Sequence, residues 1–426
     1  MKPKTKLQHR VAVLSAGLQP ITAHQRDYAV RHCFEHLAFL RKSGEAVCLE
    51  CGNRWKVSSK GNAVCPHCGS KVKLQATNKL VYSDAAYFMV MTTESEFQVL
   101  RYFFCKQECC AGRQTSYRTD EVCQVWMDGR GRMVVMSIAR RIMSMYCDDW
   151  ILGTEMEVRS PRCRTTYWYD IDPFVVYPYK RILPELKRNG FSGEFHSIRP
   201  IPLLRGLLSE SRIETLFKAG QYPLVSFFAG SSQIARYWES IRICLRNGYH
   251  VSDVSLWRDM IEMLYFLGKD ARNAHYACPK DLHEAHDRWF RLQSRRREEL
   301  RRQKMIEDIN SNEEEFAANR QRFFGLQLQD GELTVLPLKS VRQVYEEGLA
   351  MKHCVFENRY YSKQYSLLLS ARVNGERMET VEVSLSELAV VQSRGRSNML
   401  TPYHERIIDL VNRNMHLIAS LDRQAG

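Results

Sequence analysis

The segments Cys48-Leu-Glu-Cys51-Gly52 and Cys65-Pro-His-Cys68-Gly69 repeat one CxxCG motif, with thirteen residues between the two cysteine pairs. Each motif forms a tight turn on which two thiolates converge, and its glycine permits the backbone conformation that points amides at sulfur. Four soft ligands at this spacing favour tetrahedral coordination of Zn2+. We therefore predict a zinc ribbon over residues 44–74, with one ion held by Cys48, Cys51, Cys65 and Cys68.

A site closed by four cysteines stabilises the fold and leaves no open coordination position. It therefore argues for scaffolding or recognition and against zinc catalysis. His67 lies inside the second motif and is expected to be a spare residue rather than a ligand. A second cysteine group is irregularly spaced, and whether it binds a metal is left open; its members are Cys105, Cys109, Cys110 and Cys123.

Basic and aromatic side chains surround the two motifs. The predicted nucleic-acid contacts are Trp55, Lys56, Lys60, Lys71 and Lys73. Lysines interleaved with an aromatic ring can hold a phosphate backbone and stack a base. Trp55 fits equally well as a core residue of the ribbon itself, so both interpretations stay open.

The chain of 426 residues carries 62 lysines and arginines against 48 acidic residues, a formal net charge of +14. Residues 1–60 contain 11 basic and 4 acidic residues, whereas residues 351–426 contain 10 and 8. This surplus favours a polyanionic partner, DNA or RNA, bound by the amino-terminal part. With 44% hydrophobic and 26% charged residues, the composition excludes a wholly disordered or collagen-like chain.

The apolar stretches are short. Residues 85–91, one of the longest, fall well below the roughly 20 residues that a membrane helix needs. The basic start and the run Val11–Leu18 are similar to a short signal peptide, but Ser15 and Gly17 interrupt the run and no small-residue cleavage site follows. Fourteen scattered cysteines favour reduced thiols over a disulfide scaffold. We expect a cytoplasmic protein without a membrane partner.

Hydrophobic patterns along the chain predict an α+β multidomain protein. The expected order is a basic segment with a helix (1–43), the zinc ribbon (44–74), a β-rich module (75–180), an all-α helical domain (181–278), a long charged helix (279–325) and a small C-terminal α+β domain (326–426). Residues 287–304 of the long helix hold eight basic and three acidic residues. Such a helix is either a solvated connector or a contact for nucleic acid or a partner protein.

Three local patterns make specific predictions. Apolar residues at three- and four-residue steps predict one amphipathic helix from Thr22 to Lys42. The turn sequences Asp128-Gly129-Arg130-Gly131 and Asn374-Gly375 predict β-hairpins. The segment Tyr403–Leu421 predicts a single closing helix.

Polar side chains gather in the last hundred residues. The candidate catalytic residues are His353, Arg372, Glu382, Gln392, Arg394 and Asn398. If an enzyme site exists here, these side chains should line one cleft around Glu382. Cys354 stands beside His353, but adjacent side chains point apart and do not readily form a nucleophile and base. Cys354 is therefore predicted to be a small buried residue.

The hairpin at Asn374-Gly375 sets which residues accompany Glu382. Pairing across an even-length turn would place Leu367, Leu369 and Ala371 on the face of Thr380 and Glu382. A carboxylate on an apolar face requires a partner, and Arg394 or His353 is the expected one. The pair is either part of a site or a structural salt bridge that closes a small sheet.

These motifs resemble those of the PcfJ-like family, which is encoded on conjugative plasmids and other bacterial mobile elements. The resemblance rests on His353-Cys354-Val355 with Tyr360-Tyr361, on Thr380-Val-Glu382, on Val391-Gln392-Ser-Arg394-Gly395 with Asn398, and on Pro279-Lys-Asp-Leu282 with His286-Asp287. It covers about residues 275–415, and Cys48-Leu-Glu-Cys51-Gly-Asn-Arg-Trp55 is similar to the ribbon-bearing members. It implies a mobile-element setting but no established activity. As motif residues it marks His353, Thr380, Glu382, Gln392, Gly395 and Asn398.

The sequence leaves three functions open. The leading one is a zinc-ribbon accessory protein of a mobile element that binds nucleic acid or a nucleoprotein complex, with mobile-element proteins as further partners. The second is an enzyme acting on nucleic acid or a nucleotide through the C-terminal residues. The third is a structural adaptor for a partner protein. The sequence contains no GxxxxGK[ST] loop, Gly-x-Ser-x-Gly elbow or HExxH helix, so ATP hydrolysis, esterase and zinc-protease activities have no support.

Overall fold

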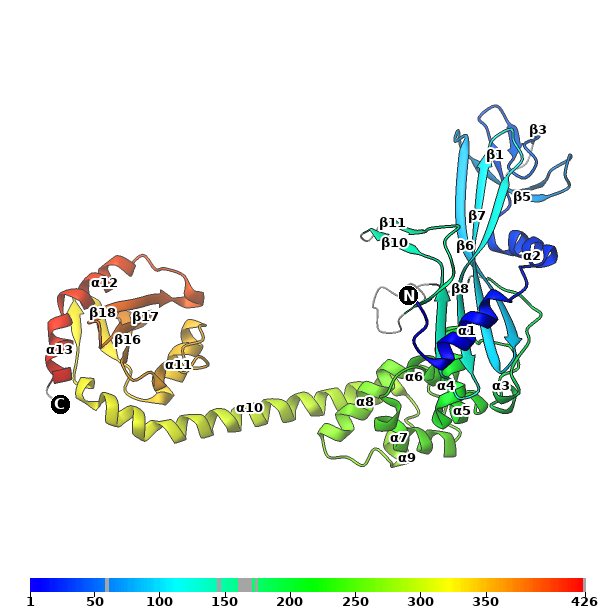
Figure 1. Ribbon diagram of the computed structural model, residues 1–426. Coiled ribbons are helices and arrows are strands. Elements are labelled where there is room, and N and C mark those ends of the chain that lie inside the picture. The colour runs from blue at the N-terminus through cyan, green and yellow to red at the C-terminus, as the bar shows by residue number, and fades with distance from the viewer. Residues whose placement is uncertain (58–60, 144–146, 160–170, 172, 174, 424–426) are drawn as a thin grey trace. The chain divides into compact units, whose positions relative to one another are not determined.

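The computed structural model describes residues 1–57, 61–143, 147–159, 171, 173 and 175–423 (Figure 1). It divides into two compact units, Met1–Trp289 and Phe290–Gly426, which we call unit 1 and unit 2. Helices and sheets occur in both, which confirms the predicted α+β fold class. Among the described residues, no helix combines the length and the apolar composition that crossing a membrane requires.

The first sheet of unit 1 carries the cysteine motifs and has the strand order β3-β2-β1-β5-β4. Its strands are β1 (Leu37–Leu40), β2 (Glu45–Cys48), β3 (Arg54–Lys56), β4 (Asn62–Val64) and β5 (Lys71–Ala76). The central strand β1 pairs antiparallel with β2 and parallel with β5. The ribbon sheet therefore depends on residues that precede both cysteine pairs.

The predicted helix from Thr22 to Lys42 is wrong beyond Cys33. Helix α2 (Ala23–Cys33) ends there, and Leu37–Leu40 form β1 instead. Leu37, Ala38 and Phe39 are all buried, because β1 has a neighbouring strand on each side and is covered on both faces. A strand covered in this way shows a continuous apolar run rather than an alternating one, and short runs of this kind do not distinguish helix from strand.

A long six-stranded sheet forms the middle of unit 1, in the order β12-β9-β8-β7-β6-β13. Its strands are β6 (Val81–Glu94), β7 (Phe97–Cys110), β8 (Ser116–Asp128), β9 (Met133–Ser137), β12 (Glu157–Arg159) and β13 (Val175–Val176); β10 (Arg140–Met143) and β11 (Cys147–Trp150) form a separate pair. The hairpin predicted at residues 128–131 is confirmed. There the Asp128 carboxylate accepts hydrogen bonds from the backbone amides of Arg130 and Arg132.

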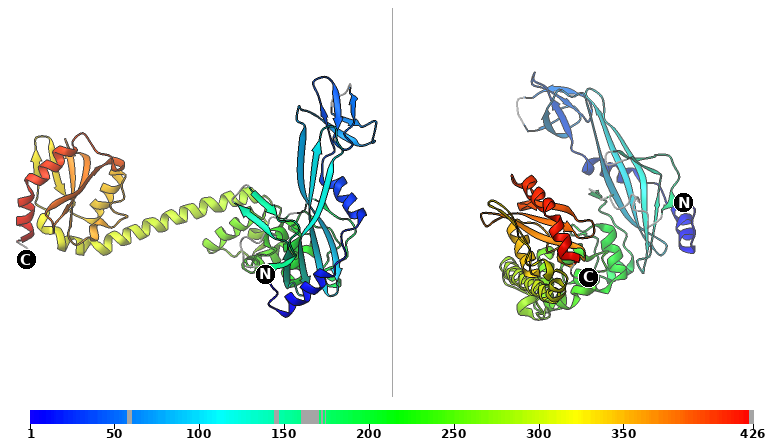
Figure 2. Two further views of the ribbon diagram at one scale, coloured as in Figure 1. Left: turned by 45° about the horizontal axis from the view of Figure 1, so that its top comes forward. Right: turned by 90° about the vertical axis from the view of Figure 1, so that its left-hand side faces the viewer.

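Both faces of this sheet are covered (Figure 2). On one face, Val11 of α1 (Lys6–Ala16) packs with Val99 and Trp126, and Ala29 of α2 packs with Phe88 and Phe103. On the other, Leu100 and Tyr102 share one core with the helices that were predicted for residues 181–278. These helices are α3 (Pro184–Arg188), α4 (Pro200–Ser209), α5 (Ser211–Lys218), α6 (Tyr222–Phe228), α7 (Ile234–Arg246), α8 (Val254–Phe266) and α9 (Ala274–Ala277).

Unit 2 is built around a sheet with the order β14-β15-β16-β17-β18. Its strands are β14 (Leu328–Asp330), β15 (Leu333–Pro337), β16 (Ser366–Val373), β17 (Glu376–Ser384) and β18 (Ala389–Gly395), and its helical segments are η2 (Gln321–Phe323), α11 (Val341–Met351), η3 (Tyr360–Ser362), η4 (Arg396–Asn398), α12 (His404–Arg413) and α13 (Met415–Arg423). The predicted long helix is α10 (Leu282–Arg320), which begins in unit 1.

Helices cover both faces of this second sheet (Figure 1), and each face has its own hydrophobic core. One contains Leu368 together with Val344 of α11 and Phe316 of α10, and the other contains Leu369 with helices α12 and α13. The closing helix predicted from Tyr403 to Leu421 is broken in two. The side-chain amide of Asn414 donates to the carbonyl of Leu410 and competes with continuation of α12.

The hairpin between β16 and β17 turns at Asn374-Gly375, as predicted, and both residues have positive φ (49° and 85°). A β-bulge then leaves Met378 without a partner, so that Leu368 lies opposite Glu382 and Ser370 lies opposite Thr380. The register expected from the sequence is therefore wrong by one residue. Because the side-chain period of a strand is two, this shift places Leu367 and Leu369 on the opposite face from Glu382.

The end of β18 requires a glycine. An added Cβ at Gly395 would lie 2.8 Å from the Thr401 side chain and 2.9 Å from the carbonyl oxygens of Met378 and Met399. Gly395→Ala should lower the free energy of unfolding of unit 2 by about 1–3 kcal/mol, since these atoms must move apart. Calorimetry of the full chain measures this loss.

Gly325→Ala is the matched control, because no atom lies within 4 Å of its added Cβ and its backbone is unstrained. Equal unfolding temperatures for the two variants would contradict the packing argument.

Candidate functional site

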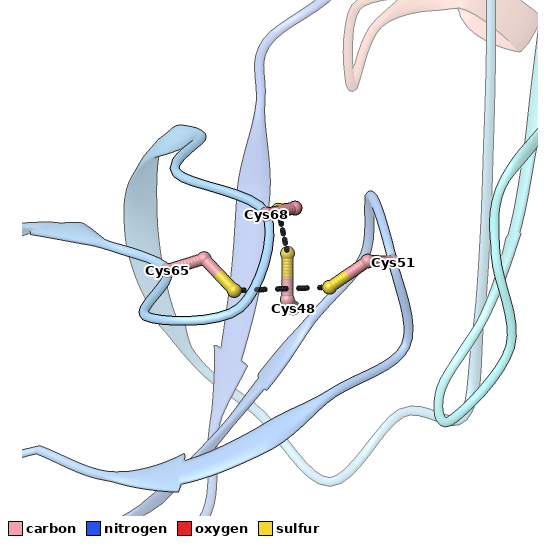
Figure 3. A group of neighbouring side chains, drawn as sticks. All are labelled: Cys48, Cys51, Cys65 and Cys68. Atoms are coloured by element: carbon pink, nitrogen blue, oxygen red, sulfur yellow. Dashed lines mark hydrogen bonds between the residues drawn. The ribbon is translucent and has the colours of Figure 1, made fainter.

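The two cysteine motifs, which follow β2 and β4, bring four sulfur atoms together at one end of the ribbon strands (Figure 3). The Sγ atoms of Cys48 and Cys68 are 3.8 Å apart, those of Cys51 and Cys65 are 3.7 Å apart, and all four lie within 4.8 Å of one another. Thiolates bound tetrahedrally at about 2.3 Å from one ion would be separated by about 3.8 Å. The donor set and its spacing therefore fit a tetrahedral metal ion.

The backbone holds both motifs in the same conformation. The amide of Cys48 donates to the carbonyl of Asn53 at 2.8 Å, and the amide of Gly52 donates back to the carbonyl of Cys48 at 2.9 Å. In the second motif, Cys65, Gly69 and Ser70 make the corresponding two bonds, both at 2.9 Å. Gly52 and Gly69 have φ of 78° and 73°, a conformation that glycine adopts without strain. This repetition is why the sequence pattern alone located the cluster.

The protein environment acts differently on the individual thiols. Burial raises the pKa of the Cys48 thiol, which is fully buried. Burial also opposes ionisation of Cys68, but its bonds to Ser70 and to neighbouring sulfurs lower its pKa to about 7. A thiol such as Cys48, whose pKa is raised, keeps its proton in the absence of a cation, so metal binding must displace that proton.

The other cysteines that the structure describes, and His67, do not join such a cluster. Among the described residues, these four thiols are the one group of three or more cysteine, histidine or acidic side chains arranged to hold a metal, and His67 is exposed outside it. Cys105 contacts Cys33, and Cys109 accepts a bond from the Thr115 hydroxyl at 3.1 Å. The second cysteine group is thus spread along β7 and β8.

The predicted nucleic-acid residues of the ribbon divide between its two faces. Lys56, Lys71 and Lys73 are exposed, and the strand pairing places them on one face. Trp55 is half-buried on the opposite face, where it packs with Cys48 and Val72. It therefore serves as a core residue of the ribbon, and the predicted combination of these lysines with its ring is not formed. Lys60 lies outside the described residues.

Lys71 and Lys73 line a cavity of about 530 Å3 on their face of the ribbon. Its other walls come from the residues before β1 and from β4, and they include Phe34, Glu35, His36, Asn62 and Val64. Lys73 forms an ion pair with Glu35 at 3.1 Å. The imidazole of His36 contacts Glu50 at 2.9 Å, and this bond raises the pKa of His36.

Unit 2 contains a polar cavity of about 430 Å3 beside β17. Of the six candidate catalytic residues, five line it: His353, Glu382, Gln392, Arg394 and Asn398. The turn after α11 supplies His353, while β17, β18 and η4 supply the others. The sixth candidate, Arg372, lies elsewhere on β16, where its Nε contacts the Ser370 hydroxyl at 3.3 Å. The predicted cleft exists, and Arg372 does not belong to it.

The partner expected for Glu382 is wrong. Its carboxylate accepts hydrogen bonds from Lys363 Nζ at 2.7 Å, Ser366 Oγ at 2.9 Å and Gln392 Nε2 at 2.9 Å. Neither Arg394 nor His353 contacts it. Lys363 follows η3, and nothing in the local sequence pattern linked it to β17. Glu382 is therefore a buried, fully bonded carboxylate at the base of the cavity.

His353 belongs to a different chain of hydrogen bonds. Its Nε2 lies 2.9 Å from Thr380 Oγ1, which donates to the Glu347 carboxylate at 3.3 Å, and Arg377 Nε donates to the same carboxylate at 2.7 Å. Burial lowers the pKa of His353, so its imidazole is neutral near pH 7. Cys354 is exposed at the cavity, which corrects the prediction of a buried residue.

Two buried carboxylates of unit 2, Glu347 and Glu379, were not identified from the sequence. Glu347 is fully buried on α11, and its position on the apolar face of that helix, three residues after Val344, is a signal that could have identified it. Glu379 is fully buried on the other face of β17. Burial opposes its ionisation, but bonds from Ser393, Thr401 and His404 lower its pKa.

The comparisons with known proteins concern the C-terminal part. Residues 256–408 match the family model of the PcfJ-like proteins. The resemblance predicted from the motifs is thereby confirmed, and the matched segment includes the cavity of unit 2 and the whole of α10. No curated protein and no solved structure matches the chain.

Glu382→Gln should lower the free energy of unfolding by about 1–3 kcal/mol, because hydrogen bonds to an ionised group contribute about 1.5–3 kcal/mol each and the partner Lys363 can regain water. Thermal unfolding of the full chain measures the effect. His353→Ala, which breaks the bond to Thr380, should also destabilise the chain.

Glu387→Gln is the control, since that carboxylate is exposed after β17. If Glu382→Gln and His353→Ala both unfold at the temperature of this control, the two residues do not stabilise the fold, and these neutral results would favour a functional site over a structural role.

Proposed function

We propose that this chain is a zinc-ribbon accessory protein of a bacterial mobile element that acts in the cytoplasm and binds nucleic acid or a nucleoprotein complex. One observation carries the proposal: the exposed lysines of the ribbon lie on one face, and two of them line a cavity there. Lysines held in this way on a rigid sheet provide cationic contacts for a phosphate backbone. The PcfJ-like match of residues 256–408 supports the mobile-element setting.

Zinc is the proposed metal because four thiolates at tetrahedral spacing are its typical structural ligands. The sulfur separations of 3.7 and 3.8 Å support this assignment. A closed site would stabilise the ribbon and hold the cavity-lining strands β4 and β5, which flank Cys65 and Cys68 in the sequence. The bound ion would supply structure rather than chemistry.

Helix α10 supports a polyanionic partner independently. All residues from Ser294 to Lys304 are exposed, and this segment holds six basic and two acidic side chains. An exposed helix needs only good helix formers and balanced charges to be stable, so a basic surplus is not required by the fold. This segment offers a second set of phosphate contacts.

Freshly purified protein should contain one zinc ion per chain. Cys65→Ser should lose it and unfold residues 45–72 locally, because binding free energy contributes directly to the stability of such small modules. Elemental analysis measures the metal, and hydrogen exchange measures the local unfolding.

Cys354→Ser is the control, because this exposed cysteine lies outside the cluster. Hydrogen exchange in unit 2 should remain unchanged in both variants. Protein that is folded and free of zinc would contradict the assignment.

Nucleic-acid binding should weaken steeply between about 50 and 200 mM salt, because the lysines displace counterions from phosphates. Combined replacement of Lys56, Lys71 and Lys73 by Ala should weaken binding of all sequences alike and reduce the salt dependence. Titration of labelled single- and double-stranded oligonucleotides measures both effects.

The matched control replaces three other exposed lysines of unit 1 by Ala, so that the net charge falls by the same amount. These residues lie on or beside helices and are Lys187, Lys218 and Lys269. If both triple variants weaken nucleic-acid binding equally, the binding depends only on net charge and not on the ribbon lysines. Absence of binding at low salt would favour the adaptor function instead.

A further inference from the structure

The cavity of unit 2 is lined by polar side chains that lack hydrogen-bond partners, whereas the carboxylate on its floor is fully hydrogen-bonded. Glu382, on the floor of the cavity, forms an ion pair with Lys363 and accepts hydrogen bonds from Ser366 and Gln392. The floor therefore has no unpaired charge. In contrast, the side chains of Asn358, Arg394 and Asn398 make no hydrogen bond or ion pair within the described part of the chain. The lining therefore offers one free cation and two free amides.

Further cations stand beside the lining residues. Lys352 precedes His353 and Arg396 follows Gly395; both are exposed, and neither has an ion-pair partner among the residues that the structure describes. Helix α11 and segment η4, which contain or adjoin these positions, contact one another. Only Arg394 belongs to the lining; Lys352 and Arg396 are neighbours of lining residues in the sequence, as is the exposed carboxylate of Glu357 beside Asn358. Among the described residues, the lining itself thus holds one unpaired cation, and the carboxylate of Glu382 already has its own partner. The cavity is suited to an anion.

The backbone around the cavity is held in an uncommon conformation. Lys352, Arg359, Ser397 and Asn398 all have positive φ, between 53° and 62°. Each adjoins or belongs to the cavity lining. Gly348 permits one of these turns, because an added Cβ would lie 3.1 Å from the His353 carbonyl oxygen. Such conformations cost free energy and persist where the surrounding structure holds them, as binding sites do.

From these groups we infer that the cavity binds the phosphate-bearing end of a nucleotide, with Arg394 as the phosphate contact and the amides of Asn358 and Asn398 as contacts to the base or sugar. A guanidinium donates to phosphate oxygens in pairs, which a lysine does not. Amides donate and accept at once, as the edges of bases do. A cavity of about 430 Å3 lies within the range of small-ligand sites. This site is separate from the ribbon of the proposed function.

The test uses the full chain in which Lys56, Lys71 and Lys73 are replaced by Ala, so that the ribbon contributes little to binding. The probes are the four ribonucleoside 5′-monophosphates, the corresponding nucleosides, inorganic phosphate, and a short oligonucleotide with or without a 5′-phosphate. Calorimetric titration gives each Kd. We expect binding of the monophosphates or of the 5′-phosphorylated oligonucleotide, and at least about ten-fold weaker binding of the nucleosides and of the oligonucleotide that lacks the 5′-phosphate.

The two sources of the phosphate give different results. Tight binding of free monophosphates identifies a soluble nucleotide, whereas preference for the phosphorylated oligonucleotide identifies a strand end. Arg394→Gln should raise Kd about ten-fold, a change that corresponds to one charged hydrogen bond. Arg423→Gln, an exposed arginine on α13, is the matched control and should leave Kd unchanged.

Cys354 provides a second readout, because this exposed thiol lines the cavity. A bound ligand should slow its alkylation by iodoacetamide, while Cys278 of unit 1, which is half-buried, should react at an unchanged rate. Peptide mass spectrometry measures both rates. Absence of binding by the monophosphates and by the 5′-phosphorylated oligonucleotide at millimolar concentration, or equal Kd values for Arg394→Gln and Arg423→Gln, would overturn the inference. Neither result bears on nucleic-acid binding by the ribbon.

Discussion

Unit 2 depends on the burial of three carboxylates, Glu347, Glu379 and Glu382, each at most 4% exposed. A buried carboxylate is costly unless charged or hydrogen-bonding partners surround it. Because Glu379 and Glu382 lie on opposite faces of β17, donors must come from both sides of the sheet. Lys363 and Gln392 serve one face, and the segment from Thr401 to His404 serves the other. The positions of η3, β18 and α12 follow from this requirement.

Features set by residues close together in the sequence were predicted correctly, whereas features that depend on contacts between distant residues were not. The ribbon ligands and the turn at Asn374-Gly375 follow from short-range geometry, and both were predicted correctly. The bulge at Met378 could not be recognised, because it depends on which carboxylate finds donors across the sheet. For the same reason the sequence placed five of six candidate residues around the cavity but missed Lys363, which joins Glu382 from nineteen residues away.

The ribbon is attached to a sheet that is buried on both faces. Leu37 and Phe39 pack against Cys109 near the end of β7, and an added Cβ at Gly52 would lie only 2.6 Å from the backbone nitrogen of Arg113 in the turn between β7 and β8. Gly52 therefore serves both the cysteine motif and this contact. The lysines of the ribbon are consequently carried on a rigid support, which suits binding of an extended ligand better than a flexible tail would.

The parallel pairing of β1 with β5 has a consequence for the order of events on the ribosome. The antiparallel partner β2 leaves the ribosome shortly after β1, but β5 begins at Lys71, after Cys48, Cys51, Cys65 and Cys68 have all been synthesised. During vectorial synthesis, the cysteine cluster can therefore close before the sheet is complete. Its closure shortens the loop that β1 and β5 must span, which lowers the entropic cost of their pairing.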